Sequence, residues 1–164
     1  MPLFGTRSVV GIARDALDFA REAARDAHPD EYMGLLRGER ASHFDIDTDA
    51  GRHDYLVTDV LVIPATETSP TSASIQSNLV PNDGRSMGSI HSHPNGVLRP
   101  SDEDLMTFGK GAAHVILGAP YDPEDWRAFD RQGEPRDLPV FDVDLDNPEA
   151  FFDFTQADID EELR

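Results

Sequence analysis

An apolar strand pattern that runs into two histidines, just before a helix start, is the feature of this sequence that most restricts its fold. The segment Met87–His91 predicts a strand, and His91-Ser92-His93-Pro94 continues from its end. Side chains two residues apart on a strand point to the same face, so His91 and His93 are expected side by side. A predicted helix, Ser101–Lys110, then begins with Ser101 at its N-cap. A strand end that faces a helix start commonly forms an exposed, preorganised site.

The other periodic segments alternate between helix and strand, which favours a single mixed α/β domain. Apolar residues at helical spacing predict a first helix over Ser8–His28, which Pro29 ends. Asp45–Asp54 reads as turn material. Predicted strands cover Glu31–Gly38, Tyr55–Pro64, a short segment Ala73–Gln76, and Ala113–Leu117. Trp126–Asp130 and Leu138–Val143 flank Gln132-Gly133-Glu134 and are predicted to form a hairpin.

The character of the chain changes near its C-terminus. We expect one catalytic domain over residues 1–144 and an acidic tail over residues 145–164. The tail contains several phenylalanines among its acids, so it either packs as an amphipathic helix or is partly disordered.

The composition excludes several classes of protein. The chain has 164 residues and no cysteine, so it has neither disulfides nor thiolate metal ligands. It carries 32 acidic against 14 basic residues, for a net charge of −18, and Lys110 is its only lysine. Nucleic-acid binding is not expected, because phosphate contacts need cationic side chains. The acidic surface is typical of a protein adapted to high salt. Without a signal peptide, or the roughly 18 apolar residues of a membrane span, we expect a soluble cytoplasmic protein.

His91, His93 and Asp104 form a candidate three-ligand metal site. With no cysteine, any metal must be held by His, Asp or Glu, and three protein ligands plus one water is the pattern of catalytic zinc. Glu31 is the candidate general base that takes a proton from the water. Each residue has a simpler explanation. The histidines could be structural, and Ser101-x-x-Asp104 could be a capping box. Glu31 could be an ordinary acid at the N-terminus of a strand, or a partner for Arg37.

These residues together resemble the motif of the JAMM (MPN+) metalloprotease family. That motif is a glutamate, then His-Ser/Thr-His-Pro, then six residues, then Ser-x-x-Asp. Here Glu31, His91-Ser92-His93-Pro94 and Ser101-x-x-Asp104 match every position. The resemblance covers roughly Ser8–Val143, since the segment around Glu31 and the start of the second helix also look like the family's.

The resemblance implies a cytidine-deaminase-like MPN fold, an α/β/α sandwich with a curved mixed sheet. It implies one Zn²⁺ held by His91, His93 and Asp104, with Glu31 as general acid/base and Ser101 stabilising the oxyanion. Members hydrolyse isopeptide bonds between ubiquitin-like modifiers and lysine. The compact archaeal members are most similar, so the expected activity is removal of ubiquitin-like small archaeal modifier proteins from lysine conjugates (desampylase). The modifier's tail would pair with a sheet edge near Ser72–Val80, unless that stretch is an ordinary surface loop.

Three other functions stay open on the sequence. A 2-His-1-carboxylate iron oxygenase uses the same ligand types, but leaves Glu31 and Ser101 without a role. A non-catalytic scaffold would not need the full ligand set. A third possibility is a peptidase that processes linear fusions or C-terminal extensions of sulfur-carrier or ubiquitin-like proteins.

Overall fold

The computed structural model describes residues 8–46, 54–62, 65–69, 72–75, 86–108 and 111–145. The helices in these ranges are α1 (Arg14–Ala27), α2 (Asp102–Thr107) and the short 3-10 helix η1 (Ala41–His43). The strands are β1 (Ser8–Ala13), β2 (Met33–Arg40), β3 (Asp54–Val62), β4 (Ala65–Ser69), β5 (Ser72–Ile75), β6 (Ser86–His93), β7 (Ala113–Gly118), β8 (Trp126–Phe129), β9 (Pro135–Arg136) and β10 (Val140–Phe141). Neither α-helix of the described part has the length and hydropathy that a membrane crossing needs.

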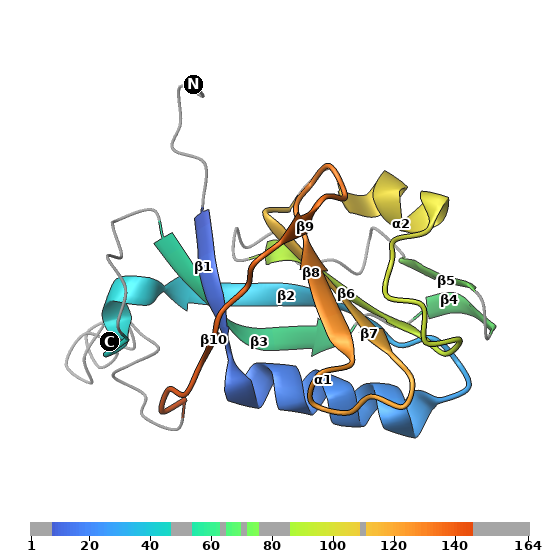
Figure 1. Ribbon diagram of the computed structural model, residues 1–164, viewed down its shortest axis with the longest axis horizontal. Coiled ribbons are helices and arrows are strands. Elements are labelled where there is room, and N and C mark those ends of the chain that lie inside the picture. The colour runs from blue at the N-terminus through green and yellow to red at the C-terminus, as the bar shows by residue number, and fades with distance from the viewer. Residues whose placement is uncertain are drawn as a thin grey trace, which may run out of the picture.

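Eight strands form one mixed sheet in the order β10-β1-β3-β2-β6-β7-β8-β9. β1 runs parallel to both β3 and β10, and β6 runs parallel to β7, whereas the other neighbours are antiparallel. β4 and β5 form a separate antiparallel pair. The strands β1 and β8 cross β2 and β3 at a steep angle (Figure 1), so the sheet is strongly curled. The predicted α/β class with a curved mixed sheet is confirmed.

The two α-helices cover opposite faces of this sheet. On β7, Val115 and Leu117 belong to the main core, which also holds the buried face of α1. Ile116 between them packs instead with Phe108, at the end of α2, and with Phe129. Because successive side chains of a strand point to opposite faces, α1 and α2 lie on opposite sides (Figure 1). This arrangement agrees with the predicted α/β/α layering.

Helix α1 packs against the sheet through small side chains. Ala16, Ala20 and Ala24 recur every fourth residue, so they lie on one helix face, and all three are buried together with Leu17. Their small size lets the helix lie close to the strands. Phe19, which the apolar periodicity placed in the same stripe, is 52% exposed.

The first helix begins later than predicted, because Ser8–Ala13 is strand β1. Its β-branched residues, Val9 and Ile12 among them, suit a strand, and β1 pairs with β3 on one side and β10 on the other. Gly11 permits this close packing, since a Cβ there would lie 2.6 Å from the Pro139 carbonyl oxygen. Pairing with strands distant in sequence therefore decides the structure of this segment.

The predicted hairpin between Trp126–Asp130 and Leu138–Val143 is wrong in its second strand. β8 pairs with the short strand β9, where Phe129 faces Pro135. The tight turn before β9 uses Gly133, whose φ of +83° favours glycine. The strand that follows, β10, pairs with β1 at the opposite end of the sheet order.

Arg136 connects β9 to the far end of the sheet. Its guanidinium donates to the Val9 carbonyl oxygen at 2.7 Å and to the Ala112 carbonyl oxygen at 3.1 Å. The curl of the sheet thus brings β9 near β1, so the chain after β9 reaches a partner that local sequence could not indicate.

The other predicted strands are confirmed with small shifts, as β2, β3, β6 and β7 show. β5 confirms the short strand predicted at Ala73–Gln76 as far as Ile75, whereas its partner β4 was not predicted. Most of the turn at Asp45–Asp54, residues 76–80 of the proposed edge, and the tail after residue 145 lie outside the described residues. The boundary between residues 144 and 145 stays a prediction.

Candidate metal centre

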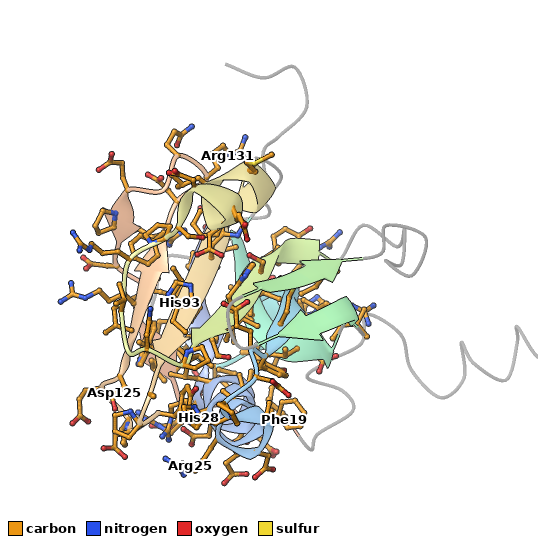
Figure 2. All side chains as sticks on the ribbon, turned by 90° about the vertical axis from the view of Figure 1, so that its right-hand side faces the viewer. Phe19, Arg25, His28, His93, Asp125 and Arg131 are labelled. Carbon is orange, nitrogen blue, oxygen red and sulfur yellow. The ribbon has the colours of Figure 1, made fainter. Side chains whose placement is uncertain are left out.

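His91 and His93 lie within the last three residues of β6, a strand in the middle of the sheet. β6 is flanked by β2 on one side and β7 on the other, where His91 faces Met33 and Ile116. Pairing on both sides holds the strand end in place. Figure 2 shows His93 on the strands between α1 and α2. Both imidazoles lie on the α2 face, as their spacing predicts, and the two side chains are 6% and 11% exposed.

Asp104 reaches both histidines from the first turn of α2. Its Oδ2 lies 3.0 Å from Nε2 of His93, and its Oδ1 lies 3.3 Å from Nδ1 of His91. Ser101 caps the helix, since its hydroxyl accepts the Asp104 N–H at 3.1 Å and its own N–H donates to Asp104 at 2.8 Å. The predicted capping box and the predicted meeting of His91, His93 and Asp104 are both present. The cap therefore orients the carboxylate that faces the imidazoles.

The loop after β6 determines which nitrogen of His93 faces Asp104. His93 Nδ1 lies 2.7 Å from the Val97 carbonyl oxygen, so this nitrogen carries the proton and Nε2 holds the lone pair in the neutral ring. The loop is held by Gly96 N–H, which donates to the His93 carbonyl oxygen, and by Asn95, which accepts from Val97 N–H at 3.0 Å. A backbone oxygen on the outer nitrogen is a usual support for a metal-ligating histidine.

The ionisation of His91 and Asp104 suits metal ligation, whereas Asp104 and Val97 favour the protonated form of His93. Burial lowers the pKa of His91 to about 4, so the ring is neutral near pH 7. Burial opposes ionisation of Asp104, but hydrogen bonds from His93 and from Ser101 N–H outweigh it and lower the Asp104 pKa to about 2. Burial also lowers the pKa of His93, yet its bonds to Asp104 and Val97 raise the pKa above the ordinary value. In the metal-free protein the anionic carboxylate therefore lies between a neutral His91 and a His93 whose Nε2 proton it attracts, and a metal bound at Nε2 would take the place of that proton.

This donor set fits a divalent ion such as zinc. As placed, the side chains contact one another directly, and no three described His, Asp or Glu side chains surround a metal position. The 3.0 Å contact between Nε2 of His93 and Oδ2 of Asp104 nevertheless approaches the spacing of about 3.3 Å between two ligand atoms on one tetrahedral zinc ion. In addition, Nε2 of His91 is buried without a hydrogen-bond partner among the described residues. An unpaired buried nitrogen is costly, and a metal bond would satisfy it.

Glu31 and Ser101 line one open cavity of about 660 Å³ together with His93. His91 and Asp104 are buried and do not line the cavity, but Asp104 contacts both His91 and the cavity-lining His93. Glu31 is half-buried, and burial raises the pKa of its carboxyl despite the opposing influence of His93. The remaining lining residues are Pro94, Asn95, Val97, Arg99, Pro100, Asp102 and Glu103. All five residues predicted from the sequence therefore gather around one site.

Sequence reasoning missed the buried polar groups that support this site. Ser92, between the two histidines, accepts a hydrogen bond from Tyr32 N–H at 2.6 Å. His114 is a structural histidine, bonded to the Ser89 hydroxyl at 2.7 Å and to the Phe108 carbonyl oxygen at 2.9 Å. Its ring stacks on Phe108 at 4.1 Å. The position of Ser92 inside the motif was a signal for its importance, whereas no local pattern indicated the contacts of His114.

Comparisons with known proteins agree with this geometry. The family model for prokaryotic homologs of the JAB domain matches residues 13–132. A protein of Haloferax volcanii named "Probable metalloprotease" is 63% identical over 163 residues, which cover 99% of both chains.

Two solved structures share the fold with moderate sequence identity. A JAB1/MPN domain protein from Archaeoglobus fulgidus is 31% identical, with a TM-score of 0.57 over 79% of this chain and 97% of that one. A structure described as JAMM, a metalloprotease-like zinc site in the proteasome and signalosome, is 29% identical, with a TM-score of 0.53 over 82% of this chain and all of that one. This chain therefore belongs to the JAMM/MPN family, as one of its prokaryotic JAB-domain metalloproteases.

Proposed function

We propose that this metalloprotease is a zinc-dependent isopeptidase that removes ubiquitin-like small archaeal modifier proteins from lysine side chains. One observation carries the chemical part: the His91, His93 and Asp104 cluster, Glu31 and Ser101 meet at a single cavity. The substrate class rests on the family motif and on the haloarchaeal source of the similar protein. The net charge of −18 is consistent with a protein that works in a cytoplasm of high salt.

His91, His93 and Asp104 would hold the zinc, which supplies Lewis acidity toward a water and toward the scissile carbonyl. Glu31 would take the proton of the attacking water and pass it to the departing lysine amine. Its raised pKa suits this double role, because a carboxyl that takes up a proton readily can also return it. Ser101 would donate its hydroxyl hydrogen to the carbonyl oxygen as negative charge develops there.

The capping bond of Ser101 is compatible with that role. Its hydroxyl oxygen accepts the Asp104 N–H, and a hydroxyl that accepts one hydrogen bond still has a hydrogen to donate. The cap also holds the oxygen at the cavity wall. Ser101 would therefore stabilise α2 and the developing oxyanion with the same group.

The extended tail of the modifier would bind along a sheet edge. β5 (Ser72–Ile75) pairs only with β4 in the described part of the chain, so its other side offers backbone groups to a strand. The rest of the proposed edge, as far as Val80, lies outside the described residues. Backbone pairing would give affinity for an extended tail without selecting its sequence.

A second candidate activity keeps the same site and changes the leaving group. The enzyme would cleave linear fusions or C-terminal extensions of sulfur-carrier or ubiquitin-like proteins. The open cavity beside Glu31 accommodates either an α-amine or a lysine amine as the leaving group. An iron-oxygenase function is not supported, because the chain belongs to a metalloprotease family.

The decisive experiment offers the zinc-loaded protein a modifier linked to a lysine side chain and, separately, the same modifier as a linear fusion. Both reactions run at high salt, with and without a chelator. We expect zinc-dependent release from the lysine conjugate, lost with chelator and restored by zinc. Glu31→Ala should abolish release while zinc stays bound. Cleavage of the linear fusion alone would replace isopeptidase activity with the second candidate, and zinc-independent release or an active Glu31→Ala variant would contradict the mechanism.

A further inference from the structure

Ser92 lies between the two histidines of the metal centre, but its side chain points away from them. Alternate residues of a strand face opposite sides, so the Ser92 hydroxyl lies on the α1 face while His91 and His93 lie on the α2 face. Ser92 is fully buried. A buried hydroxyl needs hydrogen-bond partners, and those of Ser92 connect the metal strand to the segment that carries Glu31.

Two hydrogen bonds join Ser92 to Tyr32, the residue next to Glu31. Ser92 N–H donates to the Tyr32 carbonyl oxygen at 2.9 Å, and Tyr32 N–H donates to the Ser92 hydroxyl at 2.6 Å. The regular pairing of β2 with β6 reaches only to Met33 opposite His91. The backbone bond extends the pairing by one residue, and the hydroxyl adds a bond to Tyr32 N–H at the point where the chain leaves for Glu31.

The Tyr121 hydroxyl lies on the same side as the Ser92 hydroxyl, which opposes the rise in the Tyr121 pKa that burial causes. The Tyr121 hydroxyl itself lies 2.9 Å from Nδ1 of His28. His28 ends α1, where its N–H donates to the Ala24 carbonyl oxygen. Figure 2 shows His28 at the α1 side of the molecule and His93 farther toward α2.

Tyr121 is itself held rigidly. Its carbonyl oxygen accepts hydrogen bonds from Arg21 at 2.9 Å and Arg25 at 3.0 Å, both on α1. Its N–H donates to the Gly118 carbonyl oxygen at 2.8 Å, and its side chain is 2% exposed. Tyr121 is thus held against α1, on the face of the sheet where the Ser92 hydroxyl lies.

We propose that Ser92 is a positioning residue, whose two hydrogen bonds with Tyr32 hold the neighbouring Glu31 in register with His91 and His93. A proton transfer depends on the placement of the base within about an ångström, and such a misplacement can cost on the order of 100-fold in rate. The zinc ligands do not depend on the Ser92 hydroxyl, because His93 and Asp104 are oriented from the α2 face. The inference rests on the proposed hydrolysis for its kinetic part only.

The test compares Ser92→Ala with Ser92→Thr, which keeps the hydroxyl, in the full chain. For Ser92→Ala we expect kcat on the modifier–lysine conjugate to fall about 10- to 100-fold, with KM and bound zinc within about twofold of wild type. Ser92→Thr should restore most of the loss. In the metal-free protein, hydrogen exchange followed by NMR should show the Tyr32 amide exchanging faster in Ser92→Ala only.

Ser89→Ala is the matched control, since Ser89 is a buried, hydrogen-bonded serine of the same strand whose hydroxyl contacts His114 instead of Tyr32. An equal loss of kcat in Ser89→Ala, or an unchanged Tyr32 exchange rate in Ser92→Ala, would overturn the inference. If wild type leaves the conjugate intact, the proposed substrate is wrong. The Tyr32 exchange rates in the two alanine variants then still decide whether Ser92 holds this segment.

Discussion

His93 and Asp104 are eleven residues apart in the chain, yet Nε2 of the imidazole and Oδ2 of the carboxylate lie 3.0 Å apart. The Asp104 side chain is held by the N–H of Ser101, and the His93 ring is held by the Val97 carbonyl oxygen. Both partners are therefore oriented before any metal arrives. Preorganised ligands lower the entropic cost of binding an ion.

Asp104→Asn should remove zinc from the protein. The amide lacks the negative charge that stands between the two imidazoles, and neutral oxygens bind zinc less strongly than carboxylates. We expect elemental analysis of the purified variant to show little bound zinc and the peptidase assay to show no activity. Asp102→Asn is the control, because Asp102 is an exposed acid of the same helical turn. Full zinc content in Asp104→Asn would show that Asp104 is not a ligand.

Ser101→Gly should separate the capping role from the catalytic role. Glycine at an N-cap costs only a few tenths of a kcal/mol relative to serine, so the thermal midpoint should change little. The loss of a donor to the oxyanion should lower kcat by about 100- to 1,000-fold. Ser101→Thr keeps both the cap and the donor and serves as the control. A glycine variant with wild-type kcat would leave Ser101 with a capping role alone.

The carboxyl of Glu31 should titrate above the ordinary range of a glutamate in the metal-free protein, because burial raises its pKa. Added zinc should move this pKa downward, since a nearby dication stabilises the carboxylate. Carbon-13 NMR of the carboxyl, with Glu31→Gln to assign the signal, measures both values. A pKa that zinc does not change would place Glu31 too far from the metal to act on its water.

Because of His91, the metal-free protein should lose stability as the pH falls from about 6.5 to about 4. The folded pKa of His91 is lowered to about 4, so in this window the unfolded chain binds a proton that the folded protein does not. The full shift corresponds to on the order of 3 kcal/mol.

His93 acts in the opposite direction, because its raised pKa adds stability below its unfolded value and loses it as the pH rises. Urea unfolding of wild type and His91→Gln at several pH values isolates the contribution of His91. The difference in unfolding free energy between the two proteins should change across pH 4 to 6.5. A difference that is constant over this range would show that His91 is not buried as a neutral ring.

Much of the site could be predicted, because its parts are local patterns. The spacing of His91 and His93 on a strand, and of Ser101 and Asp104 at a helix start, fixes their relative directions through backbone geometry alone. The long-range errors have a different origin. Ser8–Ala13 reads as helix by its apolar spacing, but partners more than 40 residues away on β3 and β10 make it a strand.

What the sequence by itself determined is the chemistry: which residues could hold a metal, which carboxylate could move a proton, and which helix carries a cap. Only the tertiary structure decided that Glu31 reaches the cavity of His93, that β10 returns to β1, and that Tyr121 lies behind Ser92. Local patterns follow from the covalent geometry of neighbouring residues. These three contacts join segments that are far apart in the chain, so they depend on how all the strands pair in the curled sheet.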